Sequence, residues 1–391
     1  MVSVVGVGSI TTWMRRLQLC VLAVVIIAFA AWWNLYRDQS DPRPIDGDVL
    51  ASLDLSARAA LIADQAVESG APGAIVLLRS RGNQAVATAG STSRARSARI
   101  DPDTPLRIAS VTKLYTAAVL VDLSRRGLID LDTKIDAYLP APMIADLPNG
   151  KTVTVRQLLN HSAGIPDYLD LRHYLFGDWT VELSMERALR ASKRQAAPFL
   201  PGERTRYSNM GYLLAGAIAE QVTDQTFSSL IDEVLVEPLG LSSTYYGVHS
   251  PPGADLHGYG TKLRPWADAF VFWQHAGPDA GIMASASDVA QVLDALVLHD
   301  ERLNGLGSAM LEQPIGHPGH FERALGFVIR RSGSGLPIIG HRGDVPGYLT
   351  FAHAVPEVEG VVVGHITCDC PALLSVMADQ AVQAVALAQT P

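Results

Sequence analysis

The sequence has few cysteines, few charged residues and no concentration of positive charge. Only three of its 391 residues are cysteine, and Cys368 and Cys370 are so close together that a bridge between them would form a strained ring, so no disulfide framework is expected. Charged residues make up 18% of the chain and hydrophobic residues 48%, which excludes a disordered protein. The formal charge is −8 and no Lys/Arg-rich run is present, so no nucleic-acid partner is expected.

One long apolar run is present, at the N-terminus. Two arginines precede residues 17–33, which are apolar except for Gln18. As a helix this run could just cross roughly 30 Å of hydrocarbon. Residues 1–36 are therefore predicted to be either a membrane anchor, with the rest of the chain extracytoplasmic, or a cleaved signal peptide of a secreted or periplasmic protein. Residues 37–52, which contain several Asp and Pro, are predicted to be a linker.

The periodicity of apolar residues predicts one folded body over residues 53–391. Strand-like runs occur at 74–79 and 85–89 and return after residue 324, whereas helical periodicity dominates the middle. The two strand-rich ends are expected to share one sheet. The prediction is thus an α/β part, 53–119 and 270–391, with an all-helical part, 120–269, inserted between its halves.

A serine and a lysine stand three residues apart at the start of a predicted buried helix. Ser110 and Lys113 would share one face of that helix, where the amine can take the proton of the hydroxyl. Such a pair is common by chance and is usually a surface serine and a solvated lysine. Here apolar residues surround both, and an unpaired buried lysine is costly, so a functional role is indicated.

Two further segments place polar groups where they could reach the same cleft. Tyr207, Ser208 and Asn209 follow Pro201-Gly202 and directly precede a predicted helix, and a loop of this kind can aim side chains into a cleft. Downstream, Gly340-His341-Arg342-Gly343 closes a strand-like run. A bare backbone at Gly343 would let a substrate lie along the strand edge.

In this order, the three segments resemble the serine β-lactamase and penicillin-binding-protein superfamily, with its S-x-x-K, Tyr-x-Asn and H-x-G signatures. The resemblance is to the branch of class C β-lactamases and D-Ala-D-Ala carboxypeptidases, and it extends over about residues 60–388. It implies a mainly antiparallel sheet flanked by helices, with an all-α insertion. Three flanking segments are similar to the family as well: 158–165, 238–241 and 281–288.

The resemblance also implies roles for individual residues. Ser110 would be the acylated nucleophile, Lys113 its proton acceptor, and Tyr207 the group that passes a proton to the leaving group, although the identity of the base is open in this branch. Asn209 would hold the acyl side of the substrate and His341 would line the opposite wall. Gly343 and Asp344 complete the predicted substrate-binding wall, and the backbone N–H groups of Ser110 and Asp344 would stabilise an oxyanion.

Two departures from the family pattern concern the substrate. His341 stands where β-lactamases of this branch usually carry Lys, and Asp344 where many penicillin-recognising members carry Ser or Thr. Both changes weaken the binding of a carboxylate at this wall, unless arginines elsewhere supply the cation. The predicted function is hydrolysis of a small ester, amide or peptide. The alternatives are a D-alanyl-D-alanine carboxypeptidase, a β-lactamase, and a non-catalytic sensor of peptidoglycan or lactams.

Other candidates for chemistry are weaker. His317 and His320 lie in a Gly/Pro turn without a carboxylate, and His365 near the two C-terminal cysteines could be a soft metal ligand. Neither set is predicted to bind metal, and no cofactor is expected. The segment around His161 is interpreted as a structural corner, because its neighbours are turn formers.

Overall fold

The computed structural model describes residues 42–95, 98–169, 184–247, 256–260, 267–268, 277–317 and 319–388. The predicted anchor or signal segment, 1–36, and the first residues of the predicted linker, 37–41, lie outside the described residues. Among the helices that the structure describes, none is both long and apolar enough to cross a membrane.

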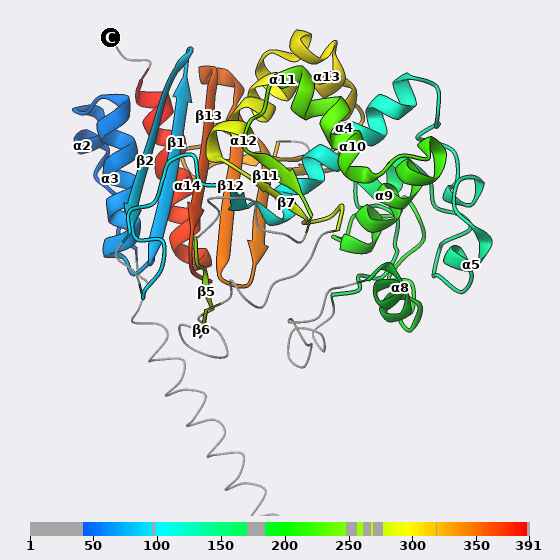
Figure 1. Ribbon diagram of the computed structural model, residues 1–391. Helices are drawn as coiled ribbons and strands as arrows, with labels where there is room; N and C mark the ends of the chain where they lie inside the picture. The colour runs from blue at the N-terminus through cyan, green and yellow to red at the C-terminus, as the bar shows by residue number, and fades with distance from the viewer. Residues whose placement is uncertain are drawn as a thin grey trace, which may run out of the picture.

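An antiparallel sheet is the centre of the molecule (Figure 1). Its order is β2-β1-β13-β12-β11-β10-β9-β8, so that strands from the two ends of the chain are neighbours, with Ala74 opposite Ile366. The fold class is therefore as predicted. The strands are β1 Gly73–Ser80, β2 Asn83–Gly90, β8 Ile315–His317, β9 Phe321–Arg323, β10 Val328–Arg331, β11 Pro337–Val345, β12 Tyr348–Val355 and β13 Gly360–Ile366.

Helices cover one face of this sheet from both chain ends. α3 and α14 pack against each other; α3 lies against β1 and β2, and α14 against β13, β12 and β1 (Figure 1). Their apolar side chains and those of the sheet form one hydrophobic core, in which β12 and β13 are buried along their whole length. The helices on this face are α2 Gly47–Ala51, α3 Leu55–Glu68 and α14 Pro371–Leu387.

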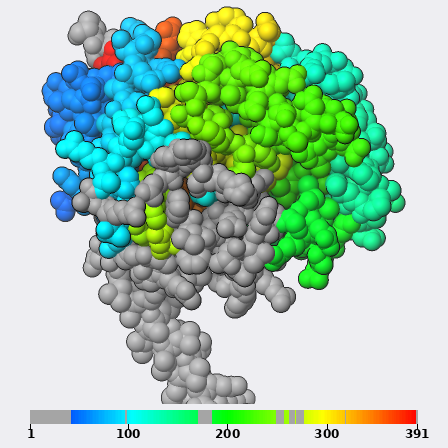
Figure 2. Space-filling model, viewed as in Figure 1, coloured from blue at the N-terminus to red at the C-terminus, as the bar shows by residue number. Residues whose placement is uncertain are grey.

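The second core lies on the other side of the sheet and continues into the helical part of the chain. In the space-filling view that part, green, and the N-terminal helices, blue, lie on opposite sides of the molecule (Figure 2). The main helices are α4 Thr112–Arg125, α5 Ala141–Ile144, α6 Val155–Leu159, α8 Met185–Lys193, α9 Asn209–Thr223, α10 Phe227–Ile231, α11 Glu237–Leu239, α12 Ala286–Leu293 and α13 Leu306–Leu311. Short 3₁₀ and π turns join or extend these helices: η1 Ala109–Val111, η2 Ile135–Ala137, η3 Asp232–Val236, η4 Asp294–Leu298 and η5 Asp300–Leu303. A further 3₁₀ turn, η6 Pro356–Val358, joins β12 to β13.

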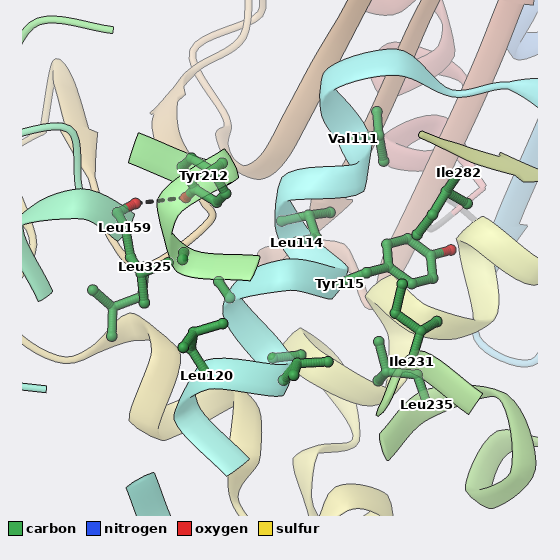
Figure 3. Close-up of a cluster of buried hydrophobic side chains, with 14 of the residues drawn as sticks. Val111, Leu114, Tyr115, Leu120, Leu159, Tyr212, Ile231, Leu235, Ile282 and Leu325 are labelled. Atoms are coloured by element: carbon green, nitrogen blue, oxygen red, sulfur yellow. Dashed lines mark hydrogen bonds between the residues drawn. The ribbon is translucent and has the colours of Figure 1, made fainter. Parts of the chain in front are cut away.

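Helix α4 runs through the middle of this second core. Eleven of its fourteen residues are buried, and apolar side chains from several other elements surround it (Figure 3). Tyr212 of α9 is also in this cluster and donates a hydrogen bond to the Leu159 carbonyl at 2.6 Å. A helix buried on all sides is rigid, so the residues at its N-terminus are held in fixed positions.

Small strands occur inside the segment that was predicted to be all-helical. β4 Thr244–Tyr246 pairs with β7 Ile282–Ala284, which also pairs with β3 Leu106–Arg107. β5 Tyr259–Gly260 and β6 Ala267–Asp268 form a separate pair. β4 is too short to show period-two alternation, and this explains why the sequence did not reveal it.

Two further expectations are corrected. The predicted linker, 37–52, contains helix α2, whose Leu50 is fully buried, so the folded body begins before residue 53. Cys368 and Cys370 form a disulfide: the turn after β13 brings their Cα atoms to 5.4 Å, within the range that a disulfide spans.

The packing of α2 leads to a stability prediction. In a chain that begins at residue 42, Leu50→Ala should lower the free energy of unfolding by about 2–5 kcal/mol, because the side chain leaves a cavity. Urea denaturation measures this change. The adjacent Val49, which is 46% exposed, is the matched control, and Val49→Ala should change stability by no more than about 0.5 kcal/mol. Equal effects of the two substitutions would mean that α2 does not belong to the folded body.

Candidate active site

The nucleophile candidate lies on a sharp turn directly before α4. Ala109 has φ = 49°, a left-handed backbone that L-residues rarely adopt, and Ser110 follows it in η1. Ser110 lines a pocket of about 600 Å³. Strained turns of this kind occur where a fold fixes the direction of a functional side chain, and here the turn exposes Ser110 at the end of a buried helix.

Lys113 is fully buried and all its hydrogen-bonding capacity is used. Its Nζ lies 3.1 Å from Ser110 Oγ, 2.8 Å from Asn209 Oδ1 and 2.8 Å from the backbone oxygen of Asp279. Burial lowers the pKa of the amine to about 8, although the negative charges of Asp279 and Asp167 act to raise it. In its neutral form the amine can donate to Asn209 and Asp279 and direct its lone pair at the Ser110 hydroxyl.

Tyr207 lies against both of these groups. Its hydroxyl is hydrogen-bonded to Ser110, and Lys113 Nζ is 4.9 Å from the centre of its ring. Burial of the phenol raises its pKa, so Tyr207 is a proton donor at neutral pH. His161 stacks on the Tyr207 ring at 4.3 Å and accepts the Ser208 N–H at its Nδ1. His161 thus supports the Tyr207 loop, in agreement with its interpretation as a structural corner.

Asn209 is the first residue of α9, and Asp167 fixes its orientation. Asp167 accepts the Asn209 backbone N–H at Oδ1, 3.2 Å away, and the amide Nδ2 at Oδ2, 3.0 Å away. The amide oxygen is thereby left to accept from Lys113. Burial raises the pKa of Asp167 to about 6. Asp167 was not identified from the sequence, although it follows the 158–165 segment by only two residues.

Strand β11 forms the opposite wall. β10 pairs with β11 only as far as Gly340, so among the described strands none covers the edge from His341 to Val345. An edge of this kind can pair with an extended substrate. The His341 ring lies 6.1 Å from the Tyr207 ring, and burial lowers the pKa of His341 to about 3, so the imidazole is neutral at pH 7. Its Nδ1 is 2.6 Å from the Arg342 carbonyl, which leaves Nε2 as an acceptor.

The remaining two wall residues differ in position. Asp344 is exposed and lines the pocket. Gly343, in contrast, faces the nucleophile turn: a β-carbon there would come within 2.2 Å of the Ile108 carbonyl oxygen. The glycine was predicted to make room for a substrate. The structure gives a different reason, which is that β11 can approach the Ser110 turn closely only without a side chain at 343.

Two more charged residues of the site were not identified from the sequence. Asp279 is buried, its carboxylate accepts from the Tyr168 hydroxyl at 2.7 Å, and its backbone oxygen accepts from Lys113. Arg323 of β9 lines the pocket and lies over the Tyr207 ring, 5.3 Å from its centre. The pocket therefore does contain a cation away from the β11 wall. No sequence signal pointed to Arg323, because β9 is only three residues long.

His365 and the two C-terminal cysteines have partners other than a metal. His365 Nδ1 is 2.8 Å from Thr350 Oγ1, and both nearby cysteines are in the disulfide. Within the described ranges, no group of three or more His, Cys, Asp or Glu side chains could hold a metal ion. Pro318, between His317 and His320, lies outside those ranges.

The geometry agrees with comparisons to known proteins. The model of the family described as Beta-lactamase matches residues 58–386. Penicillin-binding protein 4 of Amycolatopsis lactamdurans is 26% identical over 323 residues, covering 76% of this chain and 80% of that protein. Penicillin-binding protein 4* of Bacillus subtilis is 24% identical over 270 residues, and the alignment covers 62% of this chain but only 56% of that relative's length.

A solved structure of similar fold is the D-amino acid amidase from Ochrobactrum anthropi SV3 complexed with L-phenylalanine amide. The two structures superpose with a TM-score of 0.74 and are 23% identical in sequence, and the alignment covers 86% of this chain and all of that chain. This likeness confirms the fold, a main antiparallel sheet flanked by helices.

Proposed function

Because the chain belongs to the beta-lactamase family, we propose that it is a serine hydrolase that cleaves a small ester, amide or peptide through an acyl-Ser110 intermediate. The observation that carries the proposal is the 3.1 Å contact between the buried Lys113 amine and the Ser110 hydroxyl. A buried amine with a lowered pKa activates a serine in the way that a general base must.

The acylation step follows from these positions. Ser110 Oγ attacks the carbonyl carbon while its proton passes to Lys113, and the N–H groups of Ser110 and Asp344 stabilise the oxyanion. Tyr207 then gives a proton to the leaving nitrogen or oxygen as its bond to the carbonyl carbon breaks. Lys113 then passes the proton that it took to Tyr207, and water hydrolyses the acyl-Ser110 ester, which releases the acid and regenerates the Ser110 hydroxyl. In this assignment Lys113 is the base, because its pKa is lowered, and Tyr207 is the acid, because its pKa is raised.

The same geometry favours catalysis over a sensor that only binds. A binding module needs a complementary pocket, but it does not need a buried lysine whose amine is in hydrogen-bonding contact with Asn209, the Asp279 carbonyl and the half-buried Ser110 hydroxyl. We further propose that residues 1–36 tether or export the enzyme, so that it acts outside the cytoplasm, as expected from the N-terminal apolar run.

The nucleophile assignment is tested by covalent labelling. Ser110→Ala should abolish both turnover of p-nitrophenyl butyrate and labelling by a fluorophosphonate or a fluorescent penicillin, because the attacking oxygen is gone. Mass mapping of the adduct on the unchanged protein should locate it on Ser110. Ser208 is the matched control, since it is a buried serine directly before Asn209, and Ser208→Ala should still be labelled. Recovery of the adduct on Ser208 would refute the assignment.

The proton-transfer role of Tyr207 is tested by Tyr207→Phe. Acylation should slow by roughly two to four orders of magnitude, the usual contribution of a positioned general acid or base. Stopped-flow release of p-nitrophenol measures it, and near-UV circular dichroism checks that the fold is retained. Tyr245→Phe, at an exposed position that does not line the pocket, should leave the rate unchanged. A kcat/KM unaltered by Tyr207→Phe would remove this residue from the mechanism.

The pH profile tests whether Lys113 is the base. Acylation needs the neutral amine, and with a pKa of about 8 only about one tenth of the protein carries it at pH 7. The value of kcat/KM for a neutral ester should therefore rise about tenfold between pH 7 and pH 9 and then level off. A profile that is flat over this interval would contradict general-base catalysis by Lys113.

A further inference from the structure

The short strand β9 presents an exposed aromatic ring to the pocket. Five large hydrophobic side chains of the described chain are exposed, and Phe321, at 41%, is the one among them that lines the pocket. Single exposed hydrophobic residues are ordinary on a protein surface, but an apolar side chain at the mouth of a pocket is typical of a ligand-binding surface. Phe321 is therefore placed to contact a part of the substrate that lies away from the reacting bond.

Arg323 holds this ring in position. Its guanidinium lies 4.9 Å from the centre of the Phe321 ring and 5.3 Å from that of the Tyr207 ring. Contacts of a guanidinium with aromatic faces are attractive and orient both partners. The Phe321 ring is thus connected to the proposed proton donor, Tyr207, through a single side chain.

The register of β9 and β10 places further pocket residues beside Phe321. Arg330 is opposite Phe321, and Val328 is opposite Arg323. Directly opposed residues, and alternate residues along a strand, lie on the same face of a sheet, so these four side chains form one surface. All four line the pocket, and Val328 is half-buried. The surface therefore offers two apolar side chains next to the alkyl stems of two arginines.

This surface lies on the leaving-group side of the pocket. Arg323 covers the ring of Tyr207, the proposed proton donor to the leaving group, whereas Asn209 is expected to hold the acyl side. A fragment that departs past Tyr207 therefore meets Arg323 and then Phe321. A flat apolar ring in that fragment could stack on the Phe321 ring, and both surfaces would then lose their contact with water.

We propose that Phe321 and Val328 form a subsite for a flat apolar ring on the leaving fragment. The preferred substrates are then esters, amides or peptides whose departing part carries an aromatic ring a few atoms beyond the scissile bond. Phe321 is the residue that determines this specificity. The inference rests on the proposed function, because it uses the direction in which Tyr207 delivers its proton.

Two aryl esters that differ by one ring test the proposal. 4-Methylphenyl butyrate and 4-benzylphenyl butyrate share the acyl group, and both release a para-alkyl phenol of similar acidity. The protein should hydrolyse the benzyl compound with a kcat/KM about five- to fifty-fold higher, the range for covering one ring with another. Phe321→Ala should bring the ratio of the two values close to one, and Phe321→Trp should retain it. The ratio cancels any general effect of a substitution on catalysis.

Leu169→Ala is the control, because Leu169 is an apolar residue that lines the same pocket beside Asp167 and Tyr168. It should leave the ratio as it is in the unchanged protein. A ratio near one in the unchanged protein, or a ratio lost in Leu169→Ala but kept in Phe321→Ala, would overturn the proposal.

A third ester tests whether the subsite selects a flat ring. 4-(Cyclohexylmethyl)phenyl butyrate carries an apolar ring of similar size that is not flat and cannot stack on Phe321 face to face. Its kcat/KM should fall between those of the methyl and benzyl compounds. Equal values for the cyclohexylmethyl and benzyl compounds would overturn the assignment of a flat ring.

A binding measurement separates this inference from the proposed function. In Ser110→Ala, calorimetry should show tighter binding of 4-benzylphenol than of 4-methylphenol, and a second substitution, Phe321→Ala, should remove the difference. If the unchanged protein turns over neither ester but this difference is seen, the hydrolase proposal fails while the ring subsite stands. Equal binding of the two phenols to Ser110→Ala would refute the subsite itself.

Discussion

The burial of one amine, that of Lys113, is the constraint on which the arrangement of this molecule depends. An ammonium or amine removed from water is stable only if all of its hydrogen-bonding positions are filled. Here the partners come from three distant parts of the chain: Ser110 at the start of the same helix, Asn209 at the start of α9, and the Asp279 carbonyl before β7. Meeting this requirement holds the helical part of the chain against the sheet and forms the pocket between them.

The same enclosure separates the protonation states of neighbouring groups. Removal from water lowers the pKa of Lys113 and His341 and raises that of Tyr207 and Asp167, because in each case it disfavours the charged form. Base and acid therefore lie in contact without neutralising each other. In open solvent the ordinary pKa of a lysine, about 10.4, would leave fewer than about one molecule in a thousand with a neutral amine at pH 7, against about one in ten here.

The sequence was informative where function imposes a local pattern and uninformative where only tertiary contact matters. The long strands β1, β2 and β11–β13 and the helix α14 could be predicted from apolar periodicity, and Ser110, Lys113 and Asn209 from the spacing of short motifs that the fold brings together. The short strands β8 and β9 contain polar and glycine residues and show no alternation, so neither they nor Arg323 could be recognised. The role of Gly343 depends on how closely β11 approaches a turn more than 200 residues earlier, and no local pattern records that distance.

The pairing of β1 with β13 has a consequence for how the chain is made. Partners such as Ala74 and Ile366 are separated by about 290 residues, which at the usual rate of synthesis corresponds to a delay on the order of tens of seconds. Throughout that interval the growing polypeptide exposes an apolar strand with one edge unpaired, which is a template for aggregation. Factors that shield nascent chains should therefore raise the yield of folded protein, and a transcript truncated before β13 should yield a product that aggregates.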